Sequence, residues 1–232
     1  LNTTKLSTQN SVRSAEIALQ TAQAELQQTI ATQERNYTQT FENLETKNKT
    51  ARSNFESAKD YADRIFGISS KFRYQTSPDD LNIGRNNTLK RQELRNKTEV
   101  LLQNYNTYKN EKEIIRNQTV RTSTEAKKIR GFLADIQIIL NDISNLIRGT
   151  TASSNFSETT KTSLQAEADK ILASINTELI ALDNQIEAAK SQSESKELSI
   201  LSAQNRVKNS EAQVAITRAS SEAQISAAEN QL

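Results

Sequence analysis

Two neighbouring groups of polar residues have the types and spacing that could support chemistry. Asp80, Asn82 and Gly84 alternate as the oxygen ligands and the glycine of a calcium-binding loop do. No glutamate follows at the spacing that such a loop needs for its bidentate ligand. The adjacent carboxylates Asp79 and Asp80 have no further partner that would make them an acid–base pair. We therefore interpret the segment as a polar turn shaped by Pro78 and Gly84.

The composition excludes most other reactive centres. The 232 residues include no His and no Cys, so the chain has no imidazole base, thiol nucleophile, zinc site or disulfide. It also lacks a phosphate-binding glycine loop. We therefore predict that the protein is not an enzyme and has no catalytic residue, no cofactor site and no metal site.

Charge and hydropathy give little indication of a nucleic acid or a membrane as a direct partner. The net charge is +2, from 30 Lys and Arg against 28 Asp and Glu, so we expect no basic surface for a polyanion. The longest apolar stretch, 132–140, is interrupted by Asp135 and Gln137 and is too short to span a bilayer. Because the chain has no Met, we expect it to be a piece of a longer protein.

The shortage of helix-breaking residues predicts a few very long helices. The chain has four Gly and one Pro, far below average usage. Gly67 closes a first segment, Pro78 and Gly84 lie in a polar loop, and Gly149 ends a later apolar stretch. We therefore predict helices over about 7–66, 87–118, 122–148 and 156–232.

The first and last segments have coiled-coil periodicity, because apolar residues recur at steps of three and four. The stripe of the first segment runs from Val12 through Phe55 to Ile65. The stripe of the last segment begins at Leu164, and after Ala189 it thins to small and polar residues. In that half the predicted seam includes Ser193, Glu197, Gln204, Glu211 and Arg218. The seam residues expected to hold the hairpin together are Leu19, Leu26, Phe41, Leu179, Leu182 and Val214.

Aromatic residues recur along the first segment, at Tyr37, Phe41, Phe55, Tyr61 and Phe66. A stripe that stacks on a cofactor or on nucleobases would have this spacing. Core packing explains it better, because most of these residues belong to the seam itself.

The middle of the chain leaves two alternatives open. Weak helix formers lie between Asn117 and Thr124, and Thr122 with Glu125 resembles a capping box, which favours a break into two helices. The three-four periodicity nevertheless continues through this segment, as it would in one long helix. A second capping box, Asn155 with Glu158, predicts the start of the last helix.

The two ends of the chain resemble a known family. Leu1–Leu6, followed by SVRSAEIALQTAQAELQQT, resembles the first hairpin helix of bacterial periplasmic adaptor proteins, also called membrane fusion proteins (hemolysin-D/AcrA-like). The closing LSAQNRVKNSEAQVAITRASSEAQISAAENQL resembles the returning helix of that hairpin. In the family this hairpin projects from a lipoyl and β-barrel base, neither of which is in this chain.

The resemblance implies an all-α fold: a long antiparallel coiled-coil hairpin, with two inserted helices that form a distal four-helix bundle, as a single domain over 1–232. It implies a spacer and oligomerisation surface in a transporter-linked export or efflux system of the cell envelope. The implied partners are other copies of the protein and, through the full-length protein, an inner-membrane transporter. The Arg, Leu and Ser tip motif of members that dock an outer-membrane channel is not found, so such a channel is not expected.

A different class of function is also compatible with the sequence. A single middle helix would give a three-helix up-down-up bundle with its ends far apart, as in a spectrin-like or surface-fibre module with a structural or adhesive role. A coiled coil of a sensory protein is a third possibility. The distance between the two chain ends distinguishes a hairpin from a rod.

Overall fold

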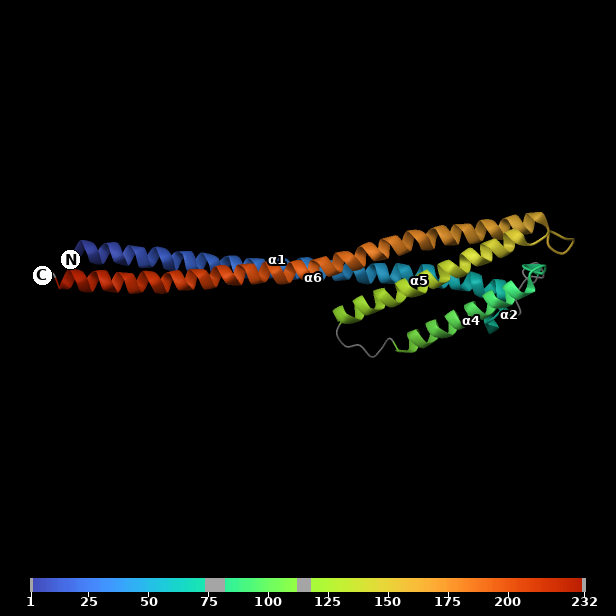
Figure 1. Ribbon diagram of the computed structural model, residues 1–232, viewed down its shortest axis with the longest axis horizontal. Helices are drawn as coiled ribbons and strands as arrows, with labels where there is room; N and C mark the ends of the chain where they lie inside the picture. The colour runs from blue at the N-terminus through green and yellow to red at the C-terminus, as the bar shows by residue number, and fades with distance from the viewer. Residues whose placement is uncertain (1, 74–81, 112–117, 231–232) are drawn as a thin grey trace. The chain divides into compact units, whose positions relative to one another are not determined.

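The computed structural model describes residues 2–73, 82–111 and 118–230 (Figure 1). Its helices are α1 (Asn2–Phe66), α2 (Ser70–Arg73), α4 (Thr88–Glu111), α5 (Gln118–Gly149) and α6 (Glu158–Glu229). Between α5 and α6 a turn contains an isolated β-bridge that joins Ser153 and Phe156. The predicted all-α fold class is confirmed.

The chain forms two compact units, and α1 and α6 contribute to both. Unit 1 consists of Leu1–Thr40 with Ala189–Leu232, and unit 2 consists of Phe41–Ala188. The sequence predicted one domain over the whole chain. Helices α4 and α5 belong to unit 2, whereas unit 1 contains only parts of α1 and α6. Unit 1 buries mainly small residues, and unit 2 buries large aliphatic and aromatic ones.

Unit 1 is an antiparallel helix pair (Figure 1, blue and red). Ion pairs join α1 to α6 along the length of unit 1. From one pair to the next, the residue number rises in α1 and falls in α6. They link Lys5 to Glu229 at 2.9 Å, Glu16 to Arg218 at 2.6 Å, Glu25 to Arg206 at 3.6 Å and Glu34 to Lys196 at 2.7 Å. The two ends of the described chain therefore lie side by side, as a hairpin requires.

Unit 2 contains four long helical segments and the short α2. Contacts along α1 and α5 advance together: the Asn48 side chain binds the Thr122 carbonyl, and the rings of Phe55 and Phe132 lie 5.5 Å apart. These two helices therefore run parallel. Helix α4 packs antiparallel to α5, with Lys90 3.5 Å from Asp142. The part of α6 in this unit runs antiparallel to α5, with Arg130 2.9 Å from Asp183 and Gln137 2.5 Å from Asn176.

The middle of the chain contains two helices, so the predicted break is confirmed and the single-helix, up-down-up alternative is wrong. The break lies earlier than predicted, because α4 ends at Glu111 and α5 begins at Gln118. Thr122 and Glu125 therefore lie inside α5, and the predicted capping box there is wrong. Both side chains face the interior instead.

Two other helix boundaries differ from the predictions. Helix α1 begins at Asn2 rather than near residue 7. Helix α6 begins at Glu158, and its cap is Ser157, whose Oγ accepts a hydrogen bond from the Thr160 amide at 3.0 Å. The predicted cap, Asn155, instead offers its carbonyl to the Asn82 side chain at 3.1 Å.

Gly67 ends α1 as predicted, in the left-handed conformation with φ of 57°. Its amide donates to the Asp63 carbonyl at 2.7 Å, and the Asp63 carboxylate accepts the amides of Ile68 and Ser69 at 3.1 and 2.8 Å. The buried Asp63 thus satisfies backbone donors that follow the helix. The loop predicted over 68–86 contains α2, while Pro78, Asp79 and Asp80 lie outside the described residues.

Candidate functional site

The residues proposed to hold the hairpin together lie in two places. Leu19 and Leu26 are half-buried in unit 1, and Val214 is buried there on α6. Phe41 is half-buried in unit 2, where Leu179 and Leu182 are buried. The structure therefore places them on the inward faces of α1 and α6 within each unit. Their energetic role stays a prediction.

The seam of α6 in unit 1 agrees with the prediction at Ile200, Val207, Val214 and Ser221, and differs from it at the positions between them. Ser193, Glu197, Gln204, Glu211 and Arg218 are exposed, contrary to prediction. The inward positions belong to the residue before each of them: Gln192, Lys196, Ala203, Ser210 and Thr217. Arg218 lies at the edge, where its charge stays in water and pairs with Glu16.

Large aliphatic side chains lie on the outer faces of unit 1. The exposed fractions are 60% for Leu6 and 53% for Ile17 on α1, and 67%, 53% and 62% for Leu198, Leu201 and Ile216 on α6. Each lies two residues from an inward-facing residue, which is a rotation of about 200° around a helix. We call these five residues the outer stripes. On each helix they project away from the seam.

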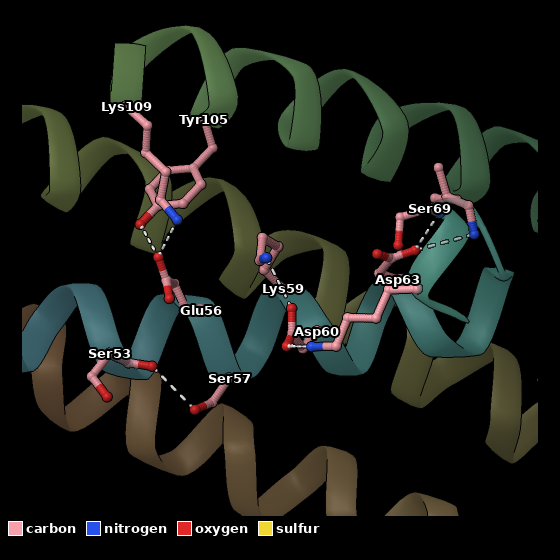
Figure 2. A network of polar contacts seen from close by, with 11 residues as sticks. Ser53, Glu56, Ser57, Lys59, Asp60, Asp63, Ser69, Tyr105 and Lys109 are labelled. Carbon is pink, nitrogen blue, oxygen red and sulfur yellow. Dashed lines mark hydrogen bonds and ion pairs between the residues drawn. The ribbon is translucent and has the colours of Figure 1, made fainter. Parts of the chain in front are cut away.

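In unit 2 a chain of polar contacts binds α1 to α4 (Figure 2). The Glu56 carboxylate accepts the Tyr105 hydroxyl at 2.8 Å and lies 2.6 Å from the Lys109 ammonium. Burial alone would raise the pKa of Glu56, but the hydrogen bonds from Lys109 and Tyr105 outweigh it and lower that pKa. Burial, reinforced by the bond to Glu56, raises the pKa of the Tyr105 hydroxyl.

A second carboxylate binds α2 to α1 in the same view (Figure 2). Asp60 contacts Lys59 at 2.8 Å and Lys71 of α2 at 2.5 Å. Burial opposes ionisation of Asp60, yet its hydrogen bonds to the two lysines leave its pKa lowered. Glu56 is thus held ionised by one lysine and a tyrosine hydroxyl, and Asp60 by two lysines. A general acid or base needs a pKa near the working pH, and the pKa values of both carboxylates are shifted away from it. The two carboxylates therefore suit the docking of helices better than proton transfer.

The aromatic residues of α1 divide between packing environments. Phe55, Tyr61 and Phe66 are buried, in line with their interpretation as core residues, whereas Tyr37 and Phe41 are half-buried. Phe55 joins an aromatic cluster with rings from α4 and α5. The ring centroids lie 4.5 Å from Phe55 to Tyr105, 5.3 Å from Tyr105 to Phe132 and 5.4 Å from Phe132 to Tyr108.

A shallow groove of about 500 Å³ lies between α4 and α5. Its floor is formed by the buried Leu101 and Ile139, and Val100 and Ile138 are its exposed apolar walls. On the rim, Lys97 pairs with Glu93 at 2.6 Å. Two exposed aliphatic side chains are normal for a protein surface, so the groove adds little to the argument for a site.

Within the described ranges, no cluster of three or more Asp and Glu side chains could hold a metal ion. None of the helices there is both long and apolar enough to cross a membrane. Of the calcium-like loop, Asn82 and Gly84 are described. The Asn82 side chain donates to the Asn155 carbonyl at 3.1 Å, and the Gly84 amide donates to the Thr150 hydroxyl at 2.9 Å.

Comparison with known proteins finds no matching family model, no matching curated protein and no matching solved structure.

Proposed function

We propose that this chain is the helical hairpin of a periplasmic adaptor, or membrane fusion, protein in a transporter-linked export system. Its role is mechanical: it is a spacer and an oligomerisation surface, and it performs no catalysis. In the finer form of the proposal the chain is a coiled-coil hairpin whose inserted α4 and α5 make a distal four-helix bundle. The lipoyl and barrel base, and through it the inner-membrane transporter, belong to the rest of the protein in the cell envelope.

The observation that carries the proposal is the antiparallel pairing of the chain's two ends. Lys5 and Glu229 form an ion pair at 2.9 Å, and the pairing continues through Glu16 and Arg218. A hairpin inserted between the two halves of another domain needs adjacent ends. A spectrin-like rod or surface fibre would instead separate its ends by most of a helix length.

The outer stripes support the oligomerisation role. Ile17 and Ile216 expose more than half of their surfaces on opposite faces of the helix pair. Burial of such side chains against another copy would contribute about 1–2 kcal/mol each, because only the exposed half of each surface is newly buried. We expect α1 of one copy to pack beside α6 of the next, because this contact buries an outer stripe from each.

The flanking sequence of the full-length gene tests the adaptor assignment. We expect glycine-rich β segments on both sides, which together make the two halves of a lipoyl domain. Flanks without them would refute this assignment. Spin labels at Leu6→Cys and Ala227→Cys test the hairpin: paired helices lie about 8–10 Å apart, whereas a 60-residue rod would separate them by about 90 Å.

Sedimentation velocity tests the oligomerisation surface separately. The wild-type chain is expected to associate with rising concentration, and Ile17→Glu with Ile216→Glu is expected to keep it monomeric. Ile138→Glu is a matched control, because Ile138 is 58% exposed but lies in unit 2. Equal loss of association in the control, or a wild type that stays monomeric, would exclude the outer stripes as that surface.

A further inference from the structure

Unit 2 contains a buried polar layer at the point where α5 begins. Asn48 of α1 is 1% exposed, and its side-chain amide donates to the Thr122 carbonyl of α5 at 3.0 Å. One turn further along, Arg52 forms an ion pair with the buried Glu125 of α5. We call Asn48, Arg52, Thr122 and Glu125 the polar layer. It joins α1 to α5 with groups that are costly to bury unpaired.

Residues of α1 on either side of Asn48 and Arg52 also contact α6. The buried Glu178 carboxylate lies 3.0 Å from Lys47 and accepts a hydrogen bond from the Asn54 side chain at 3.1 Å. Polar contacts from α1 therefore reach α5 and α6 over about two turns. Buried apolar residues of α1 lie on both sides of them, at Leu44 and Phe55.

The layer interrupts two otherwise uniform heptad seams. In α1 the fully or almost fully buried residues follow a strict four-three spacing: Leu44, Asn48, Ala51, Phe55, Ala58, Ala62 and Ile65. In α5 the same spacing holds for Thr122, Ala126, Ile129, Leu133, Ile136, Leu140, Ile143 and Ile147. Asn48 and Thr122 are the polar members of these two runs, and they contact each other.

Seams whose other members are all apolar distinguish one alignment from the next only through side-chain size. A slide of α5 along α1 by one heptad, about 10 Å, would again place apolar residues against apolar residues. It would also bring Ile129 opposite Asn48 and separate Arg52 from Glu125. The backbone carbonyl of Ile129 can accept from Asn48 as that of Thr122 does, but the buried Glu125 would lose its ion pair with Arg52, so the slide is disfavoured chiefly by that pair.

We propose that the polar layer sets the register of α5 on α1. Apolar residues at the same positions would stabilise the fold as much or more, but they would not fix the alignment of the two helices. This proposal concerns alignment within unit 2 and is independent of the proposed export function.

Distance measurements between spin labels test the proposal, because the chain contains no cysteine and accepts labels at chosen sites. Labels at the exposed Ser53 and Lys127, introduced as Ser53→Cys and Lys127→Cys, report the alignment of α1 and α5. We expect one narrow distance distribution in the otherwise wild-type chain. In the variant Asn48→Leu/Arg52→Met/Glu125→Met we expect a second population, displaced by one heptad, with an unchanged or higher melting temperature.

The control removes an ion pair of the same kind outside the layer. Arg130 and Asp183 join α5 to α6 with side chains that are each 47% exposed, and Arg130→Met/Asp183→Met should keep the single distance. If the triple variant does not fold, Asn48→Leu alone is measured, since it removes the amide without stranding a charge. A single wild-type distance in the folded variant would overturn the proposal. So would loss of helicity in Asn48→Leu, which would show that the layer stabilises the fold rather than its register.

Discussion

Adding a single methyl group at two glycines should change stability in opposite directions. Gly131 lies inside α5, and a Cβ atom built there meets nothing within 4 Å. Gly84 has a φ of 71°, and its Cβ would lie 2.8 Å from a methyl carbon of Leu146. Gly131→Ala should therefore stabilise unit 2, and Gly84→Ala should destabilise it.

The magnitudes follow from the two environments. In a helix interior Ala is favoured over Gly by about 0.8–1.0 kcal/mol, and no clash reduces that gain at Gly131. At Gly84 the left-handed backbone costs a residue with a Cβ about 1–2 kcal/mol. Crowding against the buried Leu146 typically adds about 1–3 kcal/mol. The two variants should thus differ by about 3 kcal/mol or more.

Urea unfolding measures the difference, followed by tyrosine fluorescence because Tyr61, Tyr105 and Tyr108 are buried in unit 2. With a slope of about 1–3 kcal/mol per molar urea, Gly131→Ala should raise the midpoint by about 0.3–1 M. In the Gly84→Ala background, Leu146→Ala should cost less than it does alone, because it removes the crowding. A lowered midpoint for Gly131→Ala, or an unchanged one for Gly84→Ala, would refute the reasoning.

Three further predictions address packing, charge and capping. Leu182→Ala should lower the free energy of unfolding by about 2–5 kcal/mol, because Leu182 is fully buried. Leu26→Ala should lower it less, because Leu26 is half-buried. An unchanged melting temperature in both variants would contradict the seam assignment. Since the folded state lowers the pKa of Glu56, its contribution is present above the ordinary pKa and is lost as the pH falls through the lowered value. Melting temperature against pH should therefore fall less steeply in the acid range for Glu56→Gln than for the wild type, and parallel curves would count against this role. Ser157→Ala should lower the free energy of unfolding by about 1 kcal/mol in chemical denaturation, whereas Asn155→Ala should leave helix capping intact. A larger loss for Asn155→Ala than for Ser157→Ala would show that Asn155 is the cap.

The long helices and the α1 seam could be predicted from the sequence, because both depend on local spacing. From Val12 to Ile65 the predicted stripe of α1 is buried or half-buried throughout. After Ala189 the predicted seam of α6 faces inward at Ile200, Val207 and Val214, but its other positions are displaced by one residue. There the candidates on either phase are small or polar, so hydrophobicity does not distinguish Gln192 from Ser193 or Ser210 from Glu211. Only packing against α1 decides between them.

The caps and the polar layer could not be predicted for a different reason. Ser157 and Asn155 are both good capping residues, and the turn that brings Asn155 to Asn82 involves a segment far away in the sequence. Thr122 and Glu125 have the spacing of a capping box, but their tertiary contacts with α1 make them interior residues of a helix. A charged residue at a helical position is usually solvated, so nothing local marks Glu125 and Glu178 as buried.

Periodicity and side-chain size give different information about this chain. The three-four spacing is the same in both units and predicts which face of each helix turns inward. Size decides how much that face stabilises: unit 2 buries Phe55 and Leu182, whereas the buried residues of unit 1 include Thr8, Ala189 and Ala203. Exposed ion pairs add about 0–1 kcal/mol each and cannot make up the difference. A thin seam combined with apolar outer stripes is unfavourable for an isolated helix pair in water and favourable for one packed among neighbours. Under the proposed oligomerisation role, the residues of unit 1 that matter most for function are therefore those on its outward faces.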